Sequence, residues 1–411
     1  MRAITKSIPK PGQDWPLGFQ LLDVPEPKIS TPNDVVLKVV SSGVCGTDVS
    51  IYASKQALAE QMKTVPQTHV VIGHEFCGQF HSGGTLALKH LATLAMQRPF
   101  GNQRVNKFLA SKTVEQLAVD PTFTDLLREE FYLTAEMHVT CGRGRQSPGA
   151  TATTCLQCSI GQKHLCKHTK VQGIHMDGSY AEYVRVPAED LIIFAKGEID
   201  PDIIAFMDAI GNGVHMVQAT DVVGRSLLVT GCGVQGLVAV ALGKMLGANP
   251  IICSDAVSTK LDVAKRLGAD VCVNMADADA STKLKQAVAE LTNGNGVDVV
   301  FEMSGSYRAY PDMFTNVRLG GSVTLLGLPS GSFSVDFSQQ VIFRGLTIHG
   351  VFGRRIFDSW HMMQELLAQG LGKSLQAAGV ITHRLPLERY DEGFRALQEG
   401  KAIKVLLYPN K

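Results

Sequence analysis

The region from about 214 to 345 constrains the fold more than any other part of the chain. Short apolar runs such as "SLLVTG", "PIICSD" and "VDVVFEMSG" alternate there with longer runs of helical spacing such as "VQGLVAVALGKMLGA" and "STKLDVAKRLGA". Each helix of such a pattern can carry the chain back to start the next parallel strand. We therefore expect an α/β fold in which this region forms a doubly wound parallel sheet.

A glycine motif lies at the first strand-to-helix junction of this region. Gly231, Gly233 and Gly236 have the spacing G-x-G-x-x-G, directly after an apolar strand and at the start of a helix. In that context the first glycine permits a tight turn, the second lets a pyrophosphate approach the backbone, and the third allows helix and strand to pack closely. The helix N-terminus, with Val234 and Gln235, would offer its free N–H groups to the phosphates. The alternative is a glycine-rich turn in another α/β fold.

An acidic residue follows at the place where a dinucleotide site needs one. Asp255 ends "PIICSD", the next predicted strand, and a carboxylate there can bind the adenosine ribose hydroxyls and repel a 2′-phosphate. The sequence therefore favours NAD over NADP as the cofactor. Lys260, on the following helix, weakens this preference because a cation could accept a 2′-phosphate.

Four cysteines lie between residues 141 and 166. Cys155, Cys158 and Cys166 have the spacing Cys-x2-Cys-x7-Cys, and Cys141 precedes them across a longer interval. Thiolates so spaced can converge on a tetrahedral zinc ion, and a set of four leaves no open position. We expect a structural zinc lobe with Cys141 as the fourth ligand; the alternative is a group of unrelated thiols.

A second candidate metal site draws on separate loops. Cys45 lies in "GVCGTD" after an apolar strand, and His74 and Glu75 interrupt the strand pattern of "VVIGHEFCGQF". One thiolate, one imidazole and one carboxylate suit a catalytic zinc, which keeps a position open for substrate. Taken singly, each residue could equally be a buried cysteine or a polar group at a strand end.

Composition excludes several classes of partner. The 411 residues carry a formal net charge of +1, which gives no electrostatic reason to bind nucleic acid or an anionic membrane. No run reaches the roughly 18 apolar residues of a membrane span. The first 16 residues lack the apolar core of a secretory signal, and the chain has nine cysteines. We therefore expect a cytoplasmic protein in which clustered thiols bind metal.

Together these motifs resemble the zinc-dependent medium-chain dehydrogenase/reductase family. The resemblance rests on "GVCGTD", "GHE", the cysteine spacing and the glycine motif, and it covers nearly the whole chain. Within the family, "VCGTDVSIY", "AIGNGVH" and "IFRGLTIHGVFGRRIFDSW" are most similar to the L-threonine 3-dehydrogenase group. The resemblance implies a mostly β, GroES-like catalytic domain, residues 1–213 and 346–411, around a Rossmann domain, residues 214–345. It also implies a small-molecule alcohol substrate and a homo-oligomer, a tetramer or dimer.

The resemblance also assigns roles to individual residues. Cys45, His74 and Glu75 match ligands of the catalytic zinc, and Asp208 stands where that group has a longer glutamate. Thr47 matches the hydroxyl that passes on the alcohol proton, and Ser50 replaces the histidine that continues this relay. Two further side chains are candidates for the catalytic site: His138, to assist the relay, and Arg354, to bind a substrate carboxylate. The alternative for Arg354 is a solvated turn.

The family pattern fails between about 83 and 131 and again at about 143–154. The first segment has helical spacing of Leu, Ala and Phe where short strands are expected, as in "TLALKHLATLAMQRPF". Either these segments are genuine insertions, or the chain includes noncoding sequence translated in place of true exons.

The function that follows is NAD-dependent oxidation of a secondary alcohol with zinc assistance, and L-threonine, oxidised to 2-amino-3-oxobutanoate, is the first candidate. A polyol or 2,3-diol dehydrogenase of the same family is the nearest alternative because of Ser50. An inactive nucleotide-binding homologue is the alternative of another class, because the catalytic domain is interrupted.

Overall fold

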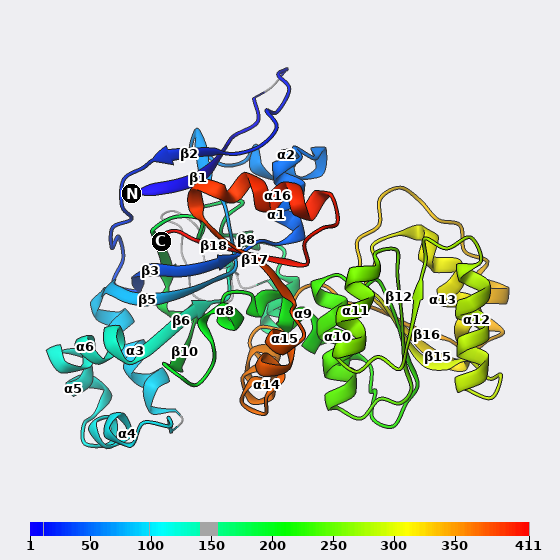
Figure 1. Cartoon of the computed structure of the whole chain (residues 1–411). Coiled ribbons are helices and arrows are strands. Elements are labelled where there is room, and N and C mark those ends of the chain that lie inside the picture. The colour runs from blue at the N-terminus through cyan, green and yellow to red at the C-terminus, as the bar shows by residue number, and fades with distance from the viewer. Residues whose placement is uncertain (11, 98, 140–154, 411) are drawn as a thin grey trace. The chain divides into compact units, whose positions relative to one another are not determined.

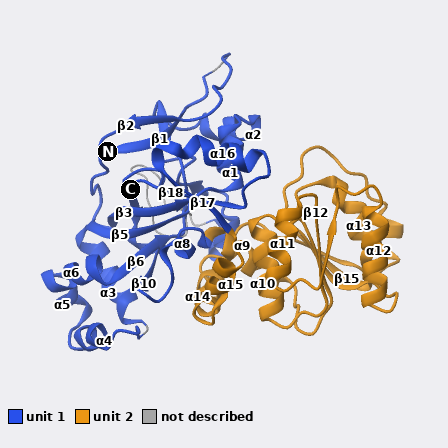
Figure 2. Cartoon of the chain, in the orientation of Figure 1, with its two compact units in different colours: residues 1–207, 381–411 blue, residues 208–380 orange. Residues whose placement is uncertain are grey.

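The computed structural model describes residues 1–10, 12–97, 99–139 and 155–410. Contacts divide the chain into two compact units, residues 1–207 with 381–411 (unit 1) and residues 208–380 (unit 2) (Figure 2). Cys141 and the segment 143–154 lie outside the described residues, so the predictions for them stay predictions.

Unit 2 contains a six-stranded parallel sheet, as the sequence predicted. The strand order is β13-β12-β11-β14-β15-β16, which is the 3-2-1-4-5-6 order of a doubly wound dinucleotide fold. Helices α10 and α11 lie on one face, and α12 and α13 on the other (Figure 1). The strands are β11 (Leu227–Thr230), β12 (Ile251–Asp255), β13 (Val271–Asn274), β14 (Val297–Glu302), β15 (Val317–Leu325) and β16 (Thr347–Gly350). The helices are α9 (Met207–Ala219), α10 (Val234–Met245), α11 (Ser258–Arg266), α12 (Ala280–Leu291), α13 (Tyr310–Asn316), α14 (Asp358–Ala368) and α15 (Leu371–Ala377).

The limits of unit 2 differ from the predicted Rossmann domain. Its first boundary falls six residues earlier, at 208 in place of 214, and its second falls at 380 in place of 345. The second difference arises because β16 pairs with β15 and because α15 packs on α10 and α14. Residues 346–380, predicted to belong to the catalytic domain, therefore lie in the compact unit of the parallel sheet.

Unit 1 is mostly β, as expected of the catalytic domain. Its main sheet has the order β10-β6-β5-β3-β18-β17, with β9 also paired to β3. The C-terminal strand β18 pairs with β3 near Ser42 and Gly43, so the last residues of the chain complete the sheet of the first. The strands of unit 1 are β1 (Arg2–Ser7), β2 (Gln20–Asp23), β3 (Asp34–Gly43), β4 (His69–Val71), β5 (Phe76–Gly83), β6 (Phe131–Ala135), β7 (His138–Val139), β8 (Lys170–Val171), β9 (Tyr183–Pro187), β10 (Leu191–Ala195), β17 (Ile381–Pro386) and β18 (Lys404–Tyr408). Its helices outside the segment 83–131 are α1 (Gly46–Tyr52), α2 (Gln56–Met62), α7 (Leu156–Ser159), α8 (Pro201–Ile204) and α16 (Tyr390–Gln398).

The segment 83–131 is helical, as its spacing predicted. It forms α3 (Thr85–Met96), α4 (Gln103–Ala110), α5 (Val114–Ala118) and α6 (Pro121–Glu129). Asn102, Thr113 and Asp120 cap the last three of these helices by accepting N–H bonds of the first turn. Apolar side chains of the segment share one core with the main sheet, among them Leu91, Leu109, Leu117, Phe123 and Leu127. Capped helices that fill a common core favour the genuine insertion over translated noncoding sequence.

Candidate active site

Cys45, His74 and Glu75 lie together in unit 1. Cys45 precedes α1 as its N-cap residue, and the other two lie in the short segment between β4 and β5. Their ligand atoms are all within 4.8 Å of one another, with His74 and Glu75 buried and Cys45 partly so. A thiolate, an imidazole and a carboxylate are the donors that zinc prefers, so this cluster fits a zinc ion.

A second layer of polar groups holds this cluster. Asp48, fully buried in α1, accepts the Cys45 backbone N–H at 2.9 Å and the Tyr180 hydroxyl at 2.6 Å. Its other carboxylate oxygen lies 3.3 Å from His74 Nδ1, which leaves Nε2 of that ring for a metal. Burial alone would lower the pKa of His74, but the Asp48 carboxylate and the Cys45 thiol raise this pKa well above its ordinary value. For Asp48 the effects have the opposite sign. Burial would raise the pKa of this carboxyl, but His74 and the hydrogen bonds from Tyr180 and Cys45 keep the pKa below its ordinary value.

Three residues of this region are missing from the sequence prediction: Asp48, Tyr180 and Lys404. Asp48 belongs to the quoted "GTD", three positions after Cys45, which is the spacing of a helix capping box. That spacing could have identified it. Tyr180 donates to Asp48, and Lys404 donates to Glu75. Both donors come from distant parts of the chain, and the folded sheet brings them to the cluster.

The predicted proton-relay residues have separate surroundings. Thr47 and Ser50 are both partly exposed on α1, three positions apart and therefore on one face. His138, on β7, faces Glu136, a fully buried carboxylate whose Oε1 lies 2.8 Å from Nδ1 of His138. The helix thus carries both hydroxyls, while the structure gives His138 a carboxylate partner.

Asp208 and Arg354 are paired with each other inside unit 2. Nη1 of Arg354 lies 2.7 Å from Oδ1 of Asp208, and both side chains are at least nine-tenths buried. The Arg354 guanidinium also lies over the Trp360 ring, at 5.8 Å from its centroid. The solvated turn, the alternative for Arg354, is therefore wrong.

The three described cysteines of the predicted zinc lobe converge. Cys155, Cys158 and Cys166 place their sulfur atoms within 4.8 Å of one another, and the Cys155 and Cys166 sulfurs are 3.8 Å apart. Cys155 is the N-cap residue of the short helix α7, and Cys158 lies within it, so the Cys-x2-Cys spacing turns two thiols to one side. These three thiols form a second cluster of zinc donors within the part of the chain that the structure describes.

The glycine motif has the local geometry that a dinucleotide turn requires. Gly231 has φ of +90°, and a Cβ there would meet Ser304 Cα at 2.5 Å. A Cβ on Gly236 would lie 1.9 Å from the Gly231 carbonyl oxygen, so this position needs glycine for close packing of helix and strand. A Cβ on Gly233 meets no atom within 4 Å, which leaves open space above the helix N-terminus. The tight turn at Gly231 and the close packing at Gly236 are as the spacing predicted, and the approach of a pyrophosphate at Gly233 stays a prediction.

Asp255 ends β12 and organises this turn. Oδ2 of Asp255 accepts the Cys232 N–H at 2.7 Å, and Oδ1 accepts the Val257 N–H at 2.8 Å. Lys260 lies half-buried on α11, the helix that follows. The carboxylate therefore has a fixed orientation at the carboxyl end of the strand, where dinucleotide ligands bind in folds of this class.

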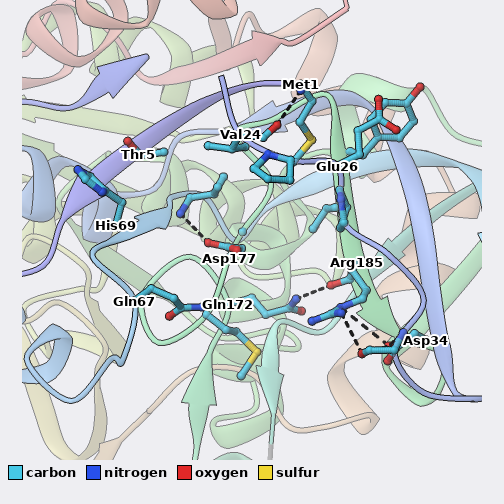
Figure 3. A pocket seen from close by; sticks show the side chains of 18 of the residues that line it. Met1, Thr5, Val24, Glu26, Asp34, Gln67, His69, Gln172, Asp177 and Arg185 are labelled. Carbon is cyan, nitrogen blue, oxygen red and sulfur yellow. Dashed lines mark hydrogen bonds and ion pairs between the residues drawn. The ribbon is translucent and has the colours of Figure 1, made fainter. Parts of the chain in front are cut away.

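Unit 1 also has a pocket away from all of these residues. It measures about 960 Å³ and is lined by residues of β1 and of segments near β4 and β9, among them Asp34, His69, Gln172, Asp177 and Arg185 (Figure 3). Arg185 and Asp34 lie opposite one another at its edge, at 3.9 Å. None of the predicted site residues that the structure describes lines this pocket, so they form the candidate active site elsewhere.

The two metal-donor clusters, the parallel sheet and the dinucleotide turn define a zinc-dependent alcohol dehydrogenase, an oxidoreductase that acts on CH–OH groups. Two family models match the chain: "Alcohol dehydrogenase GroES-like domain" over residues 31–91 and "Zinc-binding dehydrogenase" over residues 235–369. The chain belongs to the zinc-binding medium-chain dehydrogenase family, whose members bind a nicotinamide dinucleotide.

Individual relatives agree with this membership. The L-threonine 3-dehydrogenase of Saccharopolyspora erythraea is 33% identical over 409 residues, 99% of this chain and 98% of the relative. That of Bacillus velezensis is 34% identical over 410 residues, 100% of this chain and 99% of the relative. An alcohol dehydrogenase from Thermotoga maritima shares the fold, with a TM-score of 0.73, 20% identity and full coverage of both chains. A 2R,3R-butanediol dehydrogenase from Bacillus subtilis also shares it, with a TM-score of 0.72, 20% identity, and coverage of 100% of this chain and 99% of that one.

The expectation about membranes can be compared with the helices. Within the described ranges, no helix combines the length and the apolar character that crossing a bilayer requires.

Proposed function

We propose that this protein oxidises a secondary alcohol with NAD, and that L-threonine is its first candidate substrate. The observation that carries the proposal is the gathering of Cys45, His74 and Glu75 in a chain about one-third identical, over its full length, to L-threonine 3-dehydrogenases. The product of threonine oxidation would be 2-amino-3-oxobutanoate.

The residues of unit 1 would have separate roles in activating the alcohol. A zinc ion bound to the cluster of Cys45, His74 and Glu75 would act as a Lewis acid toward the alcohol oxygen. Asp48 would orient the His74 ring through Nδ1, and the hydroxyl of Thr47 would accept the alcohol proton. Ser50, one turn further along α1, can pass that proton by hydrogen bonding but cannot store it as a base near neutral pH. Cys155, Cys158 and Cys166, with Cys141 as the proposed fourth ligand, would hold a structural zinc.

The residues of unit 2 would bind the hydride acceptor. The turn from Gly231 to Gly236 would hold the pyrophosphate of NAD at the start of α10, and the bound NAD would supply the hydride acceptor. Asp255 would favour NAD over NADP because its half-buried carboxylate, fixed by two backbone N–H groups, would repel a 2′-phosphate. Lys260 would lie beside the ribose.

A polyol or 2,3-diol dehydrogenase is the second candidate. Ser50 favours it, because the threonine dehydrogenase pattern has a histidine at that position. The Asp208–Arg354 pair also favours it, because an arginine already paired with a carboxylate is less available to a substrate carboxylate. An inactive homologue has less support, since the donor residues of the cluster are all in place.

The test is NADH formation by the purified, zinc-loaded chain with L-threonine, 2,3-butanediol and sorbitol. Activity on L-threonine that disappears in Cys45→Ser supports the proposal. Activity on diols or polyols alone selects the second candidate. Folded, zinc-loaded protein that oxidises none of them contradicts both and leaves the inactive homologue.

We also propose a homo-oligomer in the cytoplasm. Strand β16 is an edge of the parallel sheet, and nearby Ile342, Phe343 and Phe352 are more than half exposed. Exposed apolar side chains beside an unpaired strand edge are typical of a surface that a second copy covers. Light scattering on the purified protein tests the oligomer: a monomer at micromolar concentration contradicts it.

A further inference from the structure

Lys404 is a lysine that the proposed chemistry does not use and that the fold buries completely. It begins β18, and none of its surface is exposed. Nζ of Lys404 donates to the Val44 carbonyl oxygen at 2.9 Å and to Oε2 of Glu75. The Phe206 ring closes the other side, at 5.5 Å from Nζ to its centroid. Burial of an ammonium group is costly unless a partner compensates its charge, and here the Glu75 carboxylate is that partner.

The backbone is shaped to admit the Lys404–Glu75 pair. A Cβ on Gly43 would lie 2.5 Å from Oε2 of Glu75 and 3.0 Å from Cε of Lys404. Gly43 ends β3, the strand that pairs with β18, so the same strand pairing that orders the sheet also brings the ammonium to the carboxylate. Any larger residue at Gly43 would push the two groups apart.

The charges around the cluster also need Lys404. As metal ligands, Cys45 and Glu75 are negatively charged, and the buried Asp48 carboxylate adds a third negative charge. A divalent zinc ion cancels two of these charges, and the Lys404 ammonium cancels the third. Net neutrality matters here because uncompensated charge is costly in a buried site.

We propose that Lys404 is a positioning residue that holds one carboxylate oxygen of Glu75 away from the metal. Glu75 can then offer the metal no more than its other oxygen, and a coordination position stays open for the alcohol. Lys404 acts through Glu75 and touches neither substrate nor cofactor. The inference rests on the proposed function for the identity of the metal site, but not for the choice of substrate.

Cobalt(II) in place of zinc gives the test a readout independent of turnover. The visible bands of cobalt weaken as its coordination number rises, and subtraction of the Cys45→Ser spectrum removes the contribution of the cysteine lobe. We expect Lys404→Met to bind as much cobalt as the wild type but with weaker bands, because Glu75 is then free to bind with both oxygens. The kcat should fall at least about 10-fold, since a closed coordination shell excludes the alcohol. A Lys404→Met spectrum that superimposes on the wild type at equal cobalt content overturns the proposal.

A second comparison covers the case in which Lys404→Met does not fold. The double variant Lys404→Met with Glu75→Gln removes both charges and avoids an unpaired carboxylate. If Lys404 acts only through Glu75, the double variant and Glu75→Gln alone have the same cobalt spectrum. If the lysine substitution still changes the spectrum in the Glu75→Gln background, Lys404 acts by another route and the proposal is wrong.

Lys6 provides a matched control in the same unit. Its side chain is 2% exposed, and among the described residues Nζ donates to the neutral oxygens of Pro16, Gly18 and Ser54, at 2.6–2.9 Å. Lys6→Met should lower the melting temperature and leave the cobalt spectrum unchanged, whereas a spectral change there would mean that loss of any buried lysine suffices. An inactive protein whose cobalt spectrum still responds to Lys404→Met contradicts the proposed function but keeps the positioning role. An active protein with an unresponsive spectrum contradicts the positioning role alone.

Discussion

Asp208 and Arg354 form a buried ion pair, with 2.7 Å between Oδ1 and Nη1. The residues are 146 positions apart, and the family resemblance assigns each a separate role, Asp208 as a zinc ligand and Arg354 as a binder of substrate carboxylate. Gly211 makes space for the pair, because a Cβ there would lie 2.7 Å from Cδ of Arg354. The carboxylate at the family's fourth ligand position thus has an arginine partner within its own unit.

This pairing predicts that Asp208→Asn acts on stability. Loss of the carboxylate that faces a buried guanidinium should lower the free energy of unfolding by about 3 kcal/mol. Urea denaturation measures this, and Asp358→Asn is the control, because Asp358 pairs with the neighbouring Arg355 at 3.6 Å on the surface. The control should change the free energy by no more than about 0.5 kcal/mol. Equal effects of the two substitutions would contradict the importance of the buried pair.

The glycine turn predicts different outcomes for two alanine substitutions. Gly236→Ala should destabilise the fold, because the new methyl would collide with the Gly231 carbonyl oxygen at 1.9 Å. Gly233→Ala should leave the melting temperature nearly unchanged, since the methyl meets no protein atom, but should weaken NADH binding about 10-fold or more by occupying pyrophosphate space. Thermal melting and NADH fluorescence titration separate the two effects. Unchanged NADH affinity in Gly233→Ala would place the dinucleotide elsewhere.

The contact of Asp48 with His74 predicts a loss of metal affinity. Asp48→Asn removes the carboxylate that orients the imidazole, so the affinity of this site for zinc should fall about 10- to 100-fold. Competition with a chelator, followed by metal analysis, measures the loss. Tyr180→Phe is the control, because it removes one hydrogen bond to Asp48 and keeps the carboxylate. A zinc affinity equal to that of the wild type in Asp48→Asn would show that His74 needs no such support.

The shared core of the helical segment predicts that the segment is integral to unit 1. Phe123 is fully buried, so Phe123→Ala should cost about 3–5 kcal/mol of unfolding free energy. Val119, in the same segment, is 82% exposed, and Val119→Ala should cost less than about 0.5 kcal/mol. Denaturant unfolding compares the two. A negligible cost for Phe123→Ala would mean that the segment does not pack as described. It would then favour the alternative that the segment is translated noncoding sequence.

Local sequence patterns were sufficient to predict the parallel sheet and the glycine turn. The period of the apolar residues and the length of each apolar run distinguish strands from helices between 226 and 325. Glycine is the residue that permits the positive φ at position 231 and the close contact at position 236. The same holds for Cys155 and Cys158, because a two-residue interval on a short helix turns both thiols to one side. Helical spacing also identified α3 to α6, although nothing in that spacing revealed what they pack against.

By itself, then, the sequence determined the fold class, the glycine turn and six of the eight predicted donors, because each depends on chemistry within a few residues of chain. These six are Cys45, His74, Glu75, Cys155, Cys158 and Cys166. Tertiary structure decided the partners of those residues. Lys404 reaches Glu75 across 329 positions because β18 pairs with β3, and Arg354 reaches Asp208 because both side chains are buried in unit 2. It also decided that residues 346–380 join the compact unit of the parallel sheet, because β16 finds its hydrogen-bond partners on β15. Such long-range pairings are selected by burial and by compensation of charge, which a local pattern does not record.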